Sequence, residues 1–190
     1  VFNSMTSYFK KISLQNQSAP DAINVVTLEG DSEQVWVGTF GEGLFMYEKN
    51  TGELKSIDLD LKNVVSLKLI DHNLWIGTWG KGLFRYDYLN HQIYQVSDAV
   101  LGENETIVSI LSGSKGSMWV ASKTGIFFIS ENEESRRIPS LNGEYHINSC
   151  AKDQKGNYYF GNTTGVVSFD ETILNQTTRP DRVKLLGVSL

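Results

Sequence analysis

The chain has 190 residues and a formal net charge of −5, and 40% of its residues are hydrophobic and 21% charged. This length suits about one domain, and the composition excludes a disordered or low-complexity protein. The negative charge argues against the clustered Lys and Arg face that nucleic-acid binding needs, so we expect no nucleic-acid partner in this segment. The single cysteine, Cys150, excludes an internal disulfide, and we interpret it as a small core residue.

The first complete unit of the chain predicts four strands. Residues 23–28 are rich in β-branched and apolar side chains, as expected for a strand buried on both faces. Residues 35–39 and 44–48 predict the second and third strands, and the sequence GEG between them predicts a glycine loop with positive φ angles. Residues 54–59 alternate apolar and polar side chains, which predicts an outer strand with one solvated face.

This unit recurs along the chain. Residues 35–48 read VWVGTFGEGLFMYE and residues 74–87 read LWIGTWGKGLFRYD, and degraded copies follow at 118–130 and 158–170. The aromatic residues of the second strand are spaced 39, 44 and 40 residues apart. They are Trp36, Trp75, Trp119 and Tyr159. Strand-rich repeats of about forty residues are typical of propeller blades.

The predicted fold class is therefore all-β: a partial β-propeller of about four four-stranded antiparallel blades plus one N-terminal strand of a preceding blade. Residues 1–14 match residues 46–59, so we interpret residues 1–17 as the end of that preceding blade. The predicted blades cover residues 18–59, 60–97, 98–140 and 141–177. Residues 178–190 predict the first strand of a following domain. The chain does not begin with Met and has no apolar run of about 18 residues, so we expect a segment of a longer protein.

Packing between propeller blades would explain why the second strand of each unit carries an aromatic residue and, in three units, a glycine two residues later. We expect the aromatic side chain of the second strand to pack against the next blade. The glycine two residues later would let the neighbouring sheet approach closely. These glycines are Gly38, Gly77 and Gly161, and the third unit has Ala121 instead. A sugar-stacking platform built from the same tryptophans is the alternative. Four blades would also leave apolar end faces, which predicts a homodimer or other self-association through them.

The two best-preserved units resemble the regulator-propeller repeat, which reads roughly W-[IV]-G-T-x-G-x-G-L-x-x-Y-[DN]. That repeat is characteristic of the periplasmic sensor regions of hybrid two-component systems in gut Bacteroidetes. The tail RPDRVKLLGVSL resembles the opening strand of the Ig-like sandwich that follows the last propeller in those sensors. The resemblance implies a non-catalytic, periplasmic segment of an inner-membrane sensor histidine kinase. It also implies that the ligand is an oligosaccharide released from a glycan and that binding controls transcription.

One set of positions is a candidate ligand site. The residues just before each inner strand are expected to line one mouth of the central channel: Asn24, Asn63, Thr106 and His146. The loops between the second and third strands should open on the same face, and they carry Phe40, Glu42, Trp79, Lys81, Lys123 and Thr163. Amide, hydroxyl, imidazole and aromatic groups together suit a carbohydrate or another small ligand. The alternative for the two asparagines is a hydrogen bond to the backbone at the start of the strand.

No motif in the chain predicts catalysis. There is no phosphate-binding glycine loop and no Cys/His spacing typical of a metal site, so we expect no cofactor, metal or catalytic residue. Two other functions stay open. An extracellular propeller lyase or hydrolase would need His and acidic residues, or a metal, converging at the channel mouth. A protein–protein interaction scaffold would use the blades only as a rigid surface.

Overall fold

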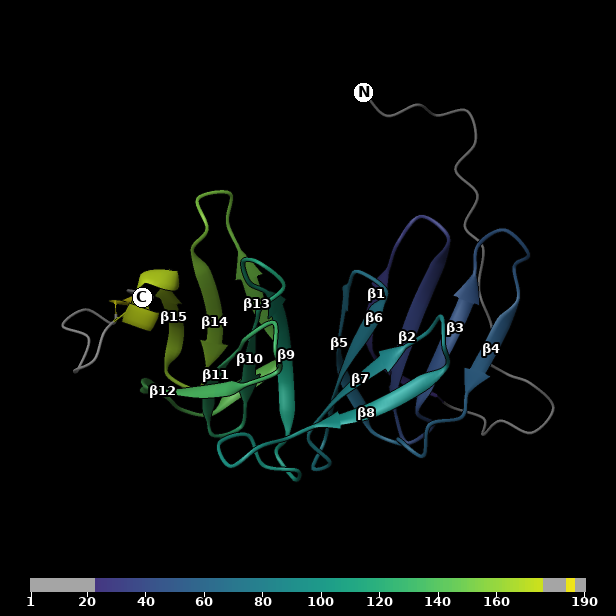
Figure 1. The fold of residues 1–190 in the computed structure, drawn as a ribbon, viewed down its shortest axis with the longest axis horizontal. Coiled ribbons are helices and arrows are strands. Elements are labelled where there is room, and N and C mark those ends of the chain that lie inside the picture. Colours follow the sequence, from purple (N-terminus) through teal and green to yellow (C-terminus); the bar gives the residue numbers. More distant parts are fainter. Residues whose placement is uncertain (1–22, 176–183, 187–190) are drawn as a thin grey trace.

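The computed structural model describes residues 23–175 and 184–186. In this part of the chain, four antiparallel four-stranded sheets follow one another as the blades of a β-propeller (Figure 1). The first sheet contains β1 (Asn24–Gly30), β2 (Gln34–Phe40), β3 (Leu44–Glu48) and β4 (Leu54–Ile57). The second contains β5 (Val64–Ile70), β6 (Asn73–Thr78), β7 (Leu83–Asp87) and β8 (Gln92–Val96). The all-β propeller class predicted from the repeat is confirmed.

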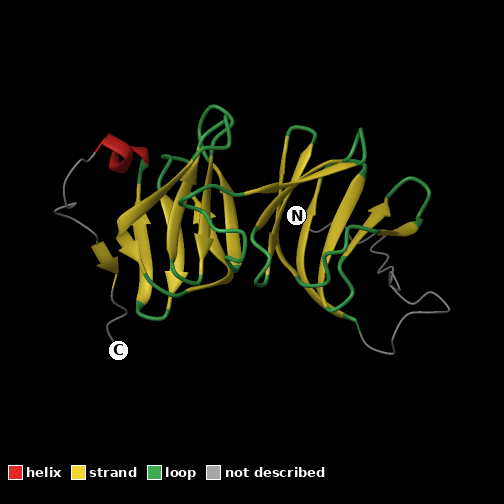
Figure 2. Cartoon of the chain, turned by 60° about the horizontal axis from the view of Figure 1, so that its bottom comes forward, coloured by secondary structure: helices red, strands yellow, loops and turns green. Residues whose placement is uncertain are grey.

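The last two sheets follow the same order. The third contains β9 (Ile107–Ser112), β10 (Met118–Ser122), β11 (Gly125–Ile129) and β12 (Ser135–Asn142). The fourth contains β13 (Tyr145–Lys152), β14 (Tyr158–Asn162), β15 (Gly165–Phe169) and β16 (Lys184–Leu186). One short 3₁₀-helix, η1 (Glu171–Asn175), lies beside this fourth sheet (Figure 2). Among the described residues, none of the helical segments is both long and apolar enough to cross a membrane.

Residues 178–190 are predicted to begin a following sandwich domain, and this domain assignment stays a prediction. Within that range, β16 pairs antiparallel with β15 through Lys184, Leu185 and Leu186. The residues directly after β15 form η1 rather than a hairpin, so the open edge of β15 accepts the later strand. The other residues of that range, and residues 1–17 assigned to a preceding blade, lie outside the described part of the chain.

Aromatic side chains fill the space between neighbouring sheets. Trp36 and Trp119 are almost completely buried, and Trp75 is buried as well. The Trp36 ring lies 5.9 Å from the Tyr86 ring of the second sheet, edge to face. The Trp119 ring lies 4.7 Å from Phe169 of the fourth sheet. Each of these contacts joins one sheet to the next, so the repeat aromatics hold successive blades together.

Tyr159, the fourth member of this set, is only half-buried. It occupies the register position of the tryptophans, since it pairs with Ala151 on β13 and Ser168 on β15. Its side chain faces away from the third sheet, and no described sheet packs on that side. The buried aromatic residues of β14 are Tyr158 and Phe160, and the Tyr158 ring lies 5.5 Å from the Trp119 ring.

The repeat glycines lie where two backbones come close. A Cβ added at Gly38 would lie 2.7 Å from Val64 Cγ1 of the second sheet, and one at Gly77 would lie 2.7 Å from the Ile107 carbonyl of the third. All three glycines also lie against a side chain of their own sheet: Thr27 Cγ2 at 2.4 Å, Ser66 Oγ at 2.0 Å and Ser149 Oγ at 2.1 Å, respectively. Gly38 and Gly77 therefore permit close packing both within and between blades, and Gly161 within its own blade.

The inner strands β1, β5, β9 and β13 lie around the centre and are joined by polar contacts. Ser66 Oγ on β5 donates to the Ile107 carbonyl on β9 at 3.0 Å, and Ser109 Oγ on β9 donates to the His146 carbonyl on β13 at 3.2 Å. The first and last inner strands meet where Asn148 Nδ2 donates to the Val26 carbonyl at 3.1 Å.

Apolar residues remain exposed on those first and last inner strands. Leu28 on β1 is 61% exposed, although its counterpart in the second sheet, Leu67, is only 5% exposed. Val25 on β1 and Ile147 on β13 are exposed as well. The predicted self-association through apolar blade faces stays a prediction that these residues make testable.

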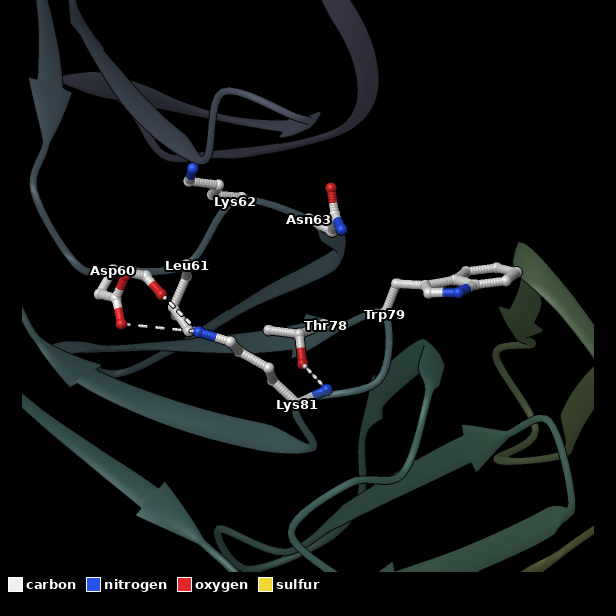
Figure 3. Close-up of a pocket in the computed structure, with 7 residues that line it drawn as sticks. All are labelled: Asp60, Leu61, Lys62, Asn63, Thr78, Trp79 and Lys81. Atoms are coloured by element: carbon white, nitrogen blue, oxygen red, sulfur yellow. Dashed lines mark hydrogen bonds and ion pairs between the residues drawn. The ribbon is translucent and has the colours of Figure 1, made fainter.

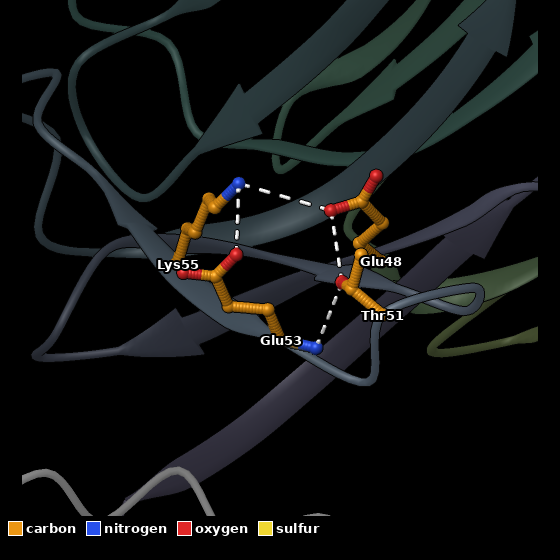
Figure 4. A network of polar contacts seen from close by, with 4 residues as sticks. All are labelled: Glu48, Thr51, Glu53 and Lys55. Carbon is orange, nitrogen blue, oxygen red and sulfur yellow. Dashed lines mark hydrogen bonds and ion pairs between the residues drawn. The ribbon is translucent and has the colours of Figure 1, made fainter.

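The outer edge of the first blade is charged rather than apolar (Figure 4). Lys55 Nζ lies 3.1 Å from Glu53 Oε2 and 3.8 Å from Glu48 Oε2. Thr51 Oγ1 donates to Glu48 Oε2 at 2.9 Å and accepts from the Glu53 N–H at 3.2 Å. Exposed ion pairs of this kind add little stability, but charged side chains on an edge strand discourage pairing with another sheet.

Candidate functional site at the channel mouth

The structure brings the two predicted sets of mouth residues together at one end of the inner strands. The backbone N–H of Trp79 donates to the Asn63 carbonyl at 3.0 Å, and that of Lys123 donates to the Thr106 carbonyl at 3.2 Å. In the first blade, Phe40 forms an isolated β-bridge with Asn63 of the second. The loops between second and third strands therefore lie against the residues that start the inner strands.

Each of the first two loops is held in a fixed shape by its threonine. Thr39 Oγ1 donates to the Gly43 carbonyl at 2.9 Å and accepts from the Glu42 N–H at 3.2 Å. Thr78 makes the same two bonds, to the Gly82 carbonyl at 2.7 Å and from the Lys81 N–H at 3.2 Å. These loops therefore present the residue after each threonine in a defined position.

The equivalent positions of the four units hold Phe40, Trp79, Lys123 and Thr163. The first three form a row across neighbouring blades. The Phe40 and Trp79 rings lie 6.0 Å apart at an angle of 75°. Both rings are exposed, by 43% and 42%, although the repeat tryptophans are buried. Lys123 Nζ lies 5.6 Å from the centre of the Trp79 ring. Lys123 thus places a positive charge beside two adjacent exposed aromatic rings.

A small cavity opens beside this row (Figure 3). Its volume is about 220 Å³, and it is lined by Asp60, Leu61, Lys62, Asn63, Thr78, Trp79 and Lys81. This is below the range of about 300–1,000 Å³ that encloses a drug-sized ligand. The cavity could therefore hold one ring-sized group but not a whole oligosaccharide.

Lys81 does not join the aromatic row. Its Nζ donates to the Asp60 carbonyl at 3.0 Å and lies 3.6 Å from Asp60 Oδ2. Figure 3 shows Lys81 extending toward Asp60 while the Trp79 ring points the opposite way. The structure thus places Lys81 on the outer side of the cavity, separate from the Trp79 ring.

The four residues that start the inner strands differ in exposure. Asn24 and His146 are exposed, and Asn63 and Thr106 are half-buried. Within residues 23–175, neither the Asn24 nor the Asn63 side-chain amide has a hydrogen-bond partner, so the capping role considered for them is not seen there. These amides are therefore available as donors and acceptors, and Asn63 lines the cavity beside Trp79.

Sequence reasoning missed one residue of the mouth. Glu144, just before β13, accepts a hydrogen bond from Lys123 Nζ at 3.0 Å. This hydrogen bond and the charge of Lys123 lower the pKa of Glu144, and His146 lowers it further. The position of Glu144 beside His146 in the sequence was the available signal. Its pairing with Lys123, 21 residues earlier, could not be read from the repeat.

The described residues offer little for metal or thiol chemistry. Among them, no three His, Cys, Asp or Glu side chains come close enough together to hold a metal ion. Cys150 is a free, half-buried thiol on β13, and burial raises its pKa. The mouth residues are instead suited to binding through stacking, hydrogen bonds and charge.

Comparisons with known proteins support the fold. No family model matches the chain, and no curated protein matches it. Among solved structures, the extracellular domain of a hybrid two component system of B. thetaiotaomicron, BT4673, is similar, with 20% identity and a TM-score of 0.68. The match covers 87% of this chain and 22% of that one. The chain has the fold of part of that ectodomain.

Two further structures show the range of the similarity. The extracellular domain of a second hybrid two component system of B. thetaiotaomicron, BT3049, has 20% identity and a TM-score of 0.67, over 85% of this chain and 23% of that one. The computationally designed Ika4 protein has 15% identity and a TM-score of 0.65, over 86% of this chain and 99% of Ika4. The chain therefore spans about a fifth of the two natural ectodomains but nearly the whole of the designed protein.

Proposed function

We propose that this chain is a non-catalytic, ligand-binding segment in the ectodomain of a hybrid two-component sensor kinase. It binds an oligosaccharide derived from a glycan at the channel mouth, on the periplasmic side of an inner membrane. Binding there would signal through the parent kinase to transcription. The fold similarity to two ectodomains of such systems and the regulator-propeller pattern of the repeat support this proposal.

The observation that carries the proposal is the exposed pair of rings, Phe40 and Trp79. Trp36, Trp75 and Trp119 of the same repeat are buried, whereas these two rings are exposed, so burial between blades does not account for them. The flat face of an aromatic ring suits the apolar face of a sugar, and nearby amides suit its hydroxyl groups. The side chains of Asn24 and Asn63 supply those amides at the same mouth.

The test is a binding measurement on the purified chain with a panel of neutral and acidic oligosaccharides. We expect at least one member to bind, and the Trp79→Ala variant to bind it about tenfold more weakly, which corresponds to about 1.4 kcal/mol. Tyr94→Ala is the matched control, because Tyr94 is 43% exposed but lies on the outer strand β8. This variant should bind like the unmodified chain.

Two results would refute the proposal. One is that no oligosaccharide binds, which would favour the scaffold function. The other is that Trp79→Ala and Tyr94→Ala bind equally well, which would place any binding elsewhere on the propeller. Breakdown of an oligosaccharide during the measurement would instead favour the lyase or hydrolase.

A further inference from the structure

The mouth carries a row of charged groups next to the aromatic platform. Lys123 Nζ lies over the Trp79 ring at 5.6 Å and bonds Glu144 Oε1 at 3.0 Å. His146, two residues after Glu144, also lowers the pKa of Glu144. A single carboxylate is thus bonded to a lysine at the edge of a stacking surface.

This ion pair is not needed to hold the fold. It lies at the surface, where such pairs add little to stability. The backbone already fixes both positions, because the Lys123 N–H donates to the Thr106 carbonyl and the Glu144 carbonyl accepts from the Thr163 N–H. Lys123 and Glu144 therefore remain free to exchange partners without disturbing the strands.

The neighbouring charged groups, Lys81 and Glu105, have other bonding partners. Lys81 is bonded to Asp60 on the outer side of the cavity, and Glu105 Oε1 accepts from Thr124 Oγ1 at 3.0 Å. Of the lysines in the two described loops that carry Trp79 and Lys123, only Lys123 lies against the exposed ring. A ligand on Trp79 would therefore meet the charge of Lys123 first.

We propose that the ligand is an acidic oligosaccharide whose ring stacks on Trp79 and whose carboxylate replaces Glu144 at Lys123 Nζ. Glu144 holds the place of the ligand's carboxylate in the free protein and is released when the ligand binds. The chemical class is a uronic acid, which carries its carboxylate on the sugar ring. This inference rests on the proposed function, because it specifies the ligand of the same site.

The exchange predicts effects of opposite sign for the two partners. Removing Lys123 removes the counter-ion of the ligand, so Lys123→Met should weaken binding of the acid about tenfold. Removing the charge of Glu144 removes the competitor, so Glu144→Gln should strengthen binding about threefold. A purely structural role of the pair would make both variants weaker.

The experiment compares tetrasaccharides of galacturonic acid and of hyaluronan with the methyl esters of the same sugars, at low and at high salt. We expect the free acid to bind about tenfold more tightly than its ester at low salt, and the difference to shrink at high salt. The difference should vanish in Lys123→Met, persist in Lys123→Arg and widen in Glu144→Gln. Lys55→Met and Glu53→Gln, both on the outer edge of the first blade, are the matched lysine and glutamate controls.

The outcomes separate this inference from the proposed function. Trp79-dependent binding of esters or neutral sugars, with no preference for the acids, overturns the inference and leaves the proposed function standing. Weaker acid binding by Glu144→Gln also overturns it. Absence of any Trp79-dependent oligosaccharide binding overturns both. Circular dichroism of each variant confirms that the strands are intact, so loss of binding is not loss of fold.

Discussion

Replacing Gly77 by alanine tests whether blade packing depends on a missing side chain. Gly77 lies on β6, and its φ is not in the left-handed region, so alanine can adopt the same backbone conformation. A methyl group there would lie 2.0 Å from Ser66 Oγ and 2.7 Å from the Ile107 carbonyl of the next blade. Steric crowding against Ser66 of the same blade and Ile107 of the next is therefore the expected cause of any loss in stability.

The expected change in the free energy of unfolding has three contributions. Overpacking a tight interior costs about 1–3 kcal/mol. Moving Ser66 Oγ also breaks its 3.0 Å bond to the Ile107 carbonyl, which adds about 1 kcal/mol. Alanine also lowers the conformational entropy of the unfolded chain, which raises the free energy of unfolding by about 0.7 kcal/mol. We expect the free energy of unfolding to fall by about 2 kcal/mol, and the melting temperature to fall by about 6 °C.

Urea unfolding followed by tryptophan fluorescence measures this difference. Gly80→Ala is the matched control, because an added Cβ there meets nothing within 4 Å, although Gly80 has a φ of 79°. That variant should lose only about 1 kcal/mol, from backbone strain alone. If Gly77→Ala is as stable as the unmodified chain, or more stable than Gly80→Ala, the close-approach explanation is wrong.

Two further predictions concern charge and assembly. Burial raises the pKa of Asp98, but hydrogen bonds from Ser135, Leu101 and Val100 outweigh it and lower the pKa to about 2. Since this pKa lies below the unfolded value of about 3.9, the carboxylate stabilises the fold above about pH 4. That contribution is lost as the pH falls toward 2, so the difference in urea midpoint between the unmodified chain and Asp98→Asn should shrink there. A difference in urea midpoint that stays constant down to pH 2 would contradict this role of Asp98. Self-association measured by light scattering should fall in Leu28→Asp, and a monomer at all concentrations in the unmodified chain would refute the apolar-face prediction.

Much of the fold could be predicted because the repeat is a local pattern. Alternating side chains, turn glycines and the spacing of Trp36, Trp75 and Trp119 predict four strands per unit and sheets that pack face to face. The contact between Trp79 and Asn63 could also be predicted, because these loops and the starts of the inner strands lie at the same end of a propeller. These properties depend on neighbours in sequence or on one repeat step.

The sequence by itself therefore determined the blade architecture and the place of the mouth. Only the tertiary structure decided which partners meet across blades. It paired β16 with β15, turned Lys81 toward Asp60, and joined Lys123 to Glu144. It also left Tyr159 half-buried while Tyr158 took the buried position. In each case a side chain or strand edge had more than one available partner, and the choice depended on which blade lies beside it in space.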